Sequence, residues 1–114
     1  MLPLQGDVGV QRARYEARWT TLIAQKGSGT RLSFTDVPWP ADGSSDPERV
    51  KALVLYGTNG TKEARKRLQA ELMRWHPDKF TAHWTPHLTP ADRQRVMDKV
   101  GETSQILTAL LSGA

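Results

Sequence analysis

Pro77 separates two helical patterns in the C-terminal part of this sequence, and this separation is the strongest constraint on its fold. Residues 61–75 and 89–111 each place apolar side chains on one helical stripe. The first stripe consists of Ala64, Leu68, Leu72 and Trp75, and the second of Val96, Val100, Thr103, Leu107 and Leu110. A proline lacks the amide hydrogen that a helix interior needs, and it disfavours helical backbone at the preceding residue, His76. The two patterns therefore predict an antiparallel helical hairpin joined across residues 76–88.

Two more helices are expected before this hairpin, so the predicted fold class is all-α. Residues 8–26 carry a further apolar stripe that ends at Gly27, and a short helix follows between Pro47 and Gly57. Side chains typical of helix N-caps precede each start. These expected caps are Asp7, Ser45 or Asp46, and Thr89, with Asp92 in the capping-box position of the last helix.

Residues 27–46 have no helical period and link the first two helices. Leu32 and Phe34 alternate with a polar residue as in a short strand, and Pro38 and Pro40 stiffen the backbone around Trp39. A flexible loop is the alternative, but a loop rarely carries so many apolar side chains. We interpret this segment as an extended arm laid across the helices.

Length and composition indicate one domain, 1–114, made of the N-terminal helix at 8–26, the arm at 27–46 and a helical core at 47–111.

The absence of cysteine excludes disulfides, thiolate metal sites and cysteine nucleophiles, and suits a reducing intracellular compartment. No apolar run is long enough to cross a bilayer, and the start MLPLQGDVGV lacks the basic flank of a signal peptide, so no membrane association is expected. The net charge of +4 favours an acidic partner.

His76 and Asp78 are displayed beside the break at Pro77. Considered alone, Asp78 is an N-cap or pairs with Arg74, and His76 is a solvated residue at a helix end. No serine partner accompanies them, so no enzyme activity, small-molecule substrate or cofactor is expected. A metal site is not expected either, because Pro86 breaks the helix that would align His83 with His87, and no cysteine or carboxylate cluster completes a ligand set.

The order of elements in the C-terminal part resembles that of a J domain, the co-chaperone module of DnaK-type heat-shock ATPases. It consists of a basic helix, the tripeptide His-Pro-Asp, a loop and an amphipathic helix. Four segments in this order are similar to the J-like C-terminal domain of the NF-kappa-B inhibitor-like family: YEARWTTL (15–22), LSFTDVPWP (32–40), RWHPDKF (74–80) and the final helix. Animal members carry ankyrin repeats, which this sequence lacks. The resemblance implies a J-domain-like hairpin and a nuclear, non-enzymatic protein linked to signalling restraint and pre-mRNA splicing. Glu71 departs from J domains, where an apolar residue is usual.

The resemblance also implies which residues contact a partner, either a DnaK-type chaperone or a splicing factor. His76, Pro77 and Asp78 match the tripeptide, Lys79 matches the lysine that usually follows, and the helix before them matches in its basic character. The remaining predicted contacts on that helix are Lys62, Lys66, Arg67, Arg74 and Met73. The alternative function is binding to RNA or the spliceosome through the basic helix at 62–74. Against RNA, the four tryptophans are expected to pack in the core instead of forming a stacking surface.

Overall fold

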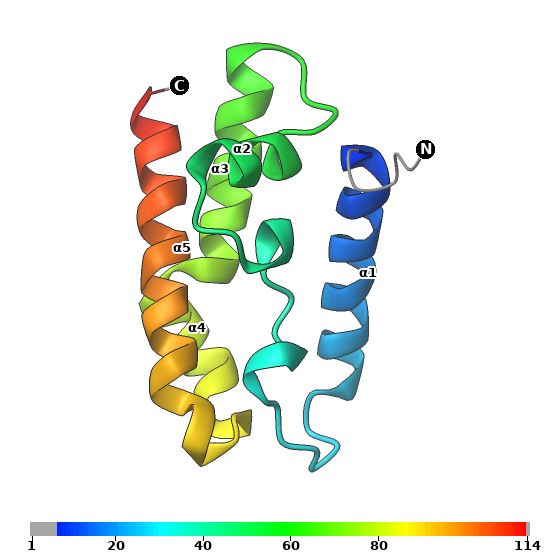
Figure 1. The fold of residues 1–114 in the computed structure, drawn as a ribbon, viewed down its shortest axis with the longest axis vertical. Coiled ribbons are helices and arrows are strands. Elements are labelled where there is room, and N and C mark those ends of the chain that lie inside the picture. Colours follow the sequence, from blue (N-terminus) through cyan, green and yellow to red (C-terminus); the bar gives the residue numbers. More distant parts are fainter. Residues whose placement is uncertain (1–6, 114) are drawn as a thin grey trace.

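The chain is all-α, as predicted, in a computed structural model that describes residues 7–113. The N-terminal residues considered for a signal peptide lie largely in 1–6, outside this range. Five α-helices are present in the described part (Figure 1): α1 Val8–Gln25, α2 Pro47–Val54, α3 Gly60–Trp75, α4 Pro77–Trp84 and α5 Arg93–Gly113. None of the described helices combines the length and apolar composition needed to cross a bilayer.

The helices form a bundle that is completed by the arm. Helices α3 and α5 lie side by side and run in opposite directions, with α4 below α3 in the view of Figure 1. In Figure 1 the arm leads from the lower end of α1 up to α2, and it passes between α1 and α5 and contacts both helices. On one side the Arg18 guanidinium donates to the carbonyls of Thr35 and Val37, at 2.8 and 3.2 Å. On the other side the 3-10 turn Phe34–Asp36 packs against α5.

Two of the expected helix caps are confirmed, and the third is wrong. The Asp7 carboxylate accepts a hydrogen bond from the Val10 amide, and the Asp46 carboxylate accepts one from the Glu48 amide. Thr89 makes no side-chain cap bond, because residues 90–92 form a 3-10 turn before α5 begins. Asp92 instead accepts a hydrogen bond from the Phe34 amide at 2.9 Å, so it ties the arm to the start of α5.

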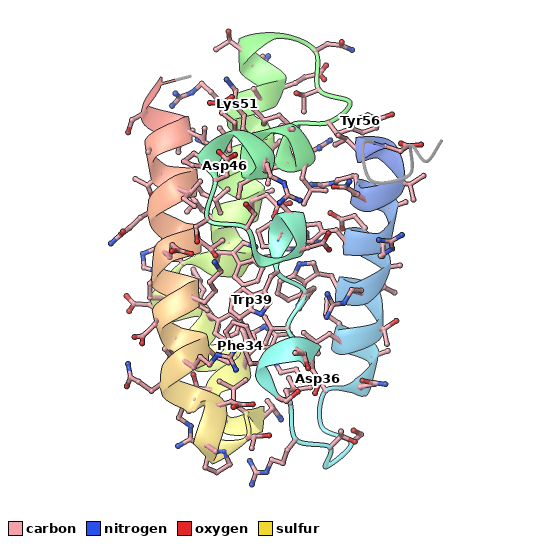
Figure 2. All side chains as sticks on the ribbon, in the orientation of Figure 1. Phe34, Asp36, Trp39, Asp46, Lys51 and Tyr56 are labelled. Atoms are coloured by element: carbon pink, nitrogen blue, oxygen red, sulfur yellow. The ribbon has the colours of Figure 1, made fainter. Side chains whose placement is uncertain are left out.

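The arm is packed on the helices, as interpreted, although its strand character is limited to one bridge. Leu32 pairs with Leu88: its amide donates to the His87 carbonyl, and its carbonyl accepts from the Thr89 amide, both at 2.8 Å. Figure 2 shows Phe34 and Trp39 between α1 and α5, and their rings lie 5.1 Å apart. Prolines at both sides of Trp39 restrict the backbone, which lowers the entropy lost when this side chain is buried.

All four tryptophans are core residues, which confirms the packing role expected for them. The Trp75 ring is at the centre of this cluster. It stacks on Trp39 with centroids 5.2 Å apart, and it meets Trp19 edge-on at 5.3 Å. Trp84 extends the cluster to α4 through Trp19, at 6.1 Å. The arm and α1 therefore belong to the same core as the α3–α5 pair.

Candidate protein-interaction site

His76 joins α3 to α4 without an intervening loop. Its amide donates to the Leu72 carbonyl at 2.8 Å and ends α3. Its ring Nδ1 accepts a hydrogen bond from the Asp78 amide at 3.2 Å, and its carbonyl accepts from the Phe80 amide, so the same residue caps the start of α4. Pro77 occupies the first position of α4, where its missing amide hydrogen costs nothing. The tripeptide is thus a compact corner between two helices.

Asp78 lies in the first turn of α4 and is exposed. Neither structural role considered from the sequence is correct, because His76 supplies the cap and Arg74 pairs with other carboxylates. No hydrogen bond or ion pair joins the Asp78 carboxylate to another side chain in residues 7–113. The corner therefore presents a free carboxylate, with the exposed Lys79 beside it.

The outward face of α3 leads to this corner. Lys62, Lys66 and Gln69 are exposed along it, and 60% of Met73 is exposed near its end. From Lys62 to His76 the helix rises about 20 Å. Four of the predicted contact residues therefore lie at the C-terminal end of α3 and the corner: Met73, His76, Asp78 and Lys79. Lys62 and Lys66 lie earlier on the outward face of α3.

The guanidinium groups of Arg67 and Arg74 are turned into the fold instead. Arg67 donates to the carbonyls of Val54 and Tyr56, at 2.9 and 3.1 Å. Arg74 donates to both oxygens of Glu16 on α1, at 2.7 and 3.0 Å. Both guanidinium groups make hydrogen bonds within the protein, and the prediction that Arg67 and Arg74 contact a partner stays a prediction.

The histidines lie in separate environments. His83 Nδ1 is 3.3 Å from the Lys26 ammonium group, and His87 meets the edge of the Trp84 ring. No three histidine, aspartate or glutamate side chains come together within the described range in a way that could hold a metal ion.

Comparison with known families matches residues 48–113, which include α3, the corner and α5, to the NF-kappa-B inhibitor-like protein 1 C-terminal domain. This chain belongs to that family. No solved structure matches it.

In this member of the NF-kappa-B inhibitor-like family, α1 precedes the matched residues, yet a buried polar network joins α1 to α3. Glu71 of α3 is only 2% exposed. Its carboxylate accepts from the Tyr15 hydroxyl at 2.6 Å, and from Arg12 and Arg74 at 3.3 Å each. The Trp75 indole in turn donates to the Tyr15 hydroxyl at 2.9 Å. Burial is tolerated here because the Glu71 charge is compensated by two cations and a hydroxyl donor.

The network changes the ionisation of its members. Burial raises the pKa of the Tyr15 hydroxyl, and the neighbouring Glu71 carboxylate adds to the rise. The hydrogen bond from Arg74 lowers the pKa of Glu16, although partial burial opposes this change. Burial alone would lower the pKa of Arg74, but its bonds with Glu16 and its attraction to Glu71 outweigh that effect and raise it. At neutral pH the network therefore holds charged Arg74 against the charged Glu16 carboxylate, with Tyr15 protonated.

The sequence did not predict this network, although Glu71 stands where J domains usually have an apolar residue. The available signal was on the first helix, where Arg12 and Glu16 flank the stripe that contains Tyr15 and Trp19. An acid at a position expected to be buried in one helix needs polar partners. The polar residues beside the apolar stripe of another helix are candidates for them. Only the structure shows that they meet.

Proposed function

We propose that this chain is a non-enzymatic protein-interaction module that works in the nucleus and engages a DnaK-type heat-shock chaperone through His76, Pro77 and Asp78. The observation that carries the proposal is the exposed Asp78 carboxylate, which lacks a side-chain partner in the described residues. Such a group can form a charge-assisted hydrogen bond with an arginine of a partner protein. The helical corner limits its movement, which reduces the entropy lost on binding.

The outward face of α3 would supply the rest of the contact. Lys62 and Lys66 carry exposed positive charge that favours an acidic surface and speeds encounter with it. Met73 adds an exposed, flexible apolar side chain close to the tripeptide. This division predicts that the lysines mainly change the association rate, while Asp78 decides whether the partner responds.

The test is single-turnover ATP hydrolysis by a DnaK-type chaperone from the same source, with and without the module. The unaltered module is expected to accelerate hydrolysis, and Asp78→Asn is expected to abolish the acceleration. Asp98→Asn is the matched control, because Asp98 is an exposed aspartate on α5 whose only side-chain bond within residues 7–113 is to Gln94. If neither the unaltered protein nor the control accelerates hydrolysis, this function is wrong.

A second candidate function is binding to RNA or to a spliceosomal component through the basic helix at 62–74. It is favoured by the exposed cations Lys62, Arg65 and Lys66 on one side of α3. It is disfavoured by the burial of all four tryptophans, which leaves no indole surface for base stacking. RNA affinity would fall steeply with salt and would be lost in Lys62→Glu/Lys66→Glu, while Asp78→Asn would leave it unchanged.

A further inference from the structure

Arg74 is the α3 cation closest to Asp78 along the chain, only four residues before it. A cation in the last turn of α3 is the natural competitor for a carboxylate in the first turn of α4, because only His76 separates the two helices. The structure instead directs its guanidinium group towards α1. Its two nitrogens reach the two Glu16 oxygens at 2.7 and 3.0 Å, and its planar group lies over the Trp19 ring at 5.0 Å.

We propose that Glu16 is a positioning residue for the tripeptide: by holding Arg74 against α1, it keeps the Asp78 carboxylate free for a partner. This inference rests on the proposed function in so far as Asp78 is the group that the partner contacts. It gives α1, which precedes the family-matched residues, a specific role in the site.

Glu16, and not Glu71, is the residue that decides the position of Arg74. The Glu16 pair uses two short hydrogen bonds, the paired geometry in which arginine holds carboxylates most strongly. Glu71 offers Arg74 a single contact at 3.3 Å, and its carboxylate already accepts from the Tyr15 hydroxyl; Arg12 pairs with both acids and does not distinguish them. Without Glu16, Arg74 would keep the long Glu71 contact and its position over the Tyr15 and Trp19 rings, but it would lose both short hydrogen bonds. Its side chain is 27% exposed, so it could then turn towards another carboxylate.

The first experiment uses the concentration of the full chain that gives half-maximal stimulation of the chaperone ATPase. Glu16→Ala should raise this concentration about two- to fivefold, the range in which an exposed ion pair can compete. Glu48→Ala removes the same charge from an exposed site on α2 and should leave it unchanged. Glu16→Gln, which keeps one carbonyl oxygen, should give a smaller increase.

Removal of the competitor should reverse the effect. Glu16→Ala/Arg74→Gln should match Arg74→Gln alone, because no guanidinium group remains to occupy Asp78. A purely structural role for Glu16 would give the opposite result, since the second substitution would weaken the protein further. An unchanged half-maximal concentration in Glu16→Ala, or a double variant that shows no recovery, would overturn the inference.

A second measurement needs no partner, and it separates this inference from the proposed function. Urea unfolding of Arg74→Gln, Asp78→Asn and their combination measures the coupling between the two residues. We expect no coupling when Glu16 is present and a favourable coupling in the Glu16→Ala background. If the chaperone ATPase does not respond to the module at all, the coupling between Arg74 and Asp78 still tests the role of Glu16. No coupling either with Glu16 present or in Glu16→Ala would refute that role.

Discussion

Replacement of Glu71 by glutamine should destabilise the protein by about 2–3 kcal/mol. Glutamine has the same size but no charge, so the change isolates the electrostatic part of the network. The Tyr15 hydroxyl donates to a carboxylate at 2.6 Å, and a hydrogen bond to a charged group contributes about 1.5–3 kcal/mol, against about 1 kcal/mol for a neutral one. This difference accounts for about 1 kcal/mol of the loss.

The remaining loss comes from the two arginines. Arg12 and Arg74 each lie 3.3 Å from Glu71, with side chains 16% and 27% exposed. Because water still reaches them, each contact contributes only about 0.5 kcal/mol. The side-chain NH2 of the glutamine is also a buried donor that lies beside two cations and has no acceptor there. This unsatisfied donor lowers the free energy of unfolding by about a further 1 kcal/mol.

The assay is urea unfolding followed by tryptophan fluorescence, since Trp75 is fully buried and bonded to Tyr15. Glu48→Gln, at an exposed position in the first turn of α2, is the control and should change stability by less than about 0.5 kcal/mol. A Glu71→Gln variant as stable as this control would refute the reasoning, because it would mean that the buried charge contributes nothing.

Three other outcomes are expected from the same structure. Because the pKa of Glu16 is lowered in the folded protein, its charge stabilises the fold above the ordinary value of 4.5, and this stabilisation is lost as the pH falls through the lower folded-state pKa. Between these two values the free energy of unfolding should therefore depend less steeply on pH in Arg74→Gln than in the unaltered protein. Removal of residues 1–46 uncovers Trp75, and the remaining chain should show no cooperative transition in calorimetry. Trp39→Ala should cost about 3–5 kcal/mol and reduce the near-ultraviolet circular dichroism, whereas equal stability would show that the arm is not part of the core.

Four of the five α-helices in residues 7–113 were predictable because the information that forms them is local, whereas α4, Pro77–Trp84, lies in the segment that was expected to be a loop. The apolar stripe of 61–75 and the break at Pro77 gave the bounds of α3 to within a residue at each end. Asp7 and Asp46 cap their helices through amides two or three positions away, so their neighbours in the sequence were sufficient to predict them. The arm was predictable for a different reason, because Trp39 between two prolines is a costly residue to leave in solvent.

The details of the site were not predictable because they depend on distant residues. Asp92 was expected to cap its own helix, but the Phe34 amide, 58 positions earlier, takes its carboxylate. The bond between Arg74 and Glu16, also 58 positions away, was not foreseen either. His76 is the exposed helix end that was expected, but its ring in addition caps α4. A local pattern shows which groups need a partner, but not which of several partners the fold brings within reach.

Contact through the helical corner is tested by a chemical-shift map of the isotope-labelled full chain with an unlabelled DnaK-type chaperone in its ATP state. The largest changes are expected at His76, Asp78 and Met73, and they should continue along α3 to Lys66 and Lys62. They should also disappear in Asp78→Asn, whose spectrum otherwise matches the unaltered protein. Changes confined to other surfaces, or a map that Asp78→Asn leaves intact, would contradict contact through the corner.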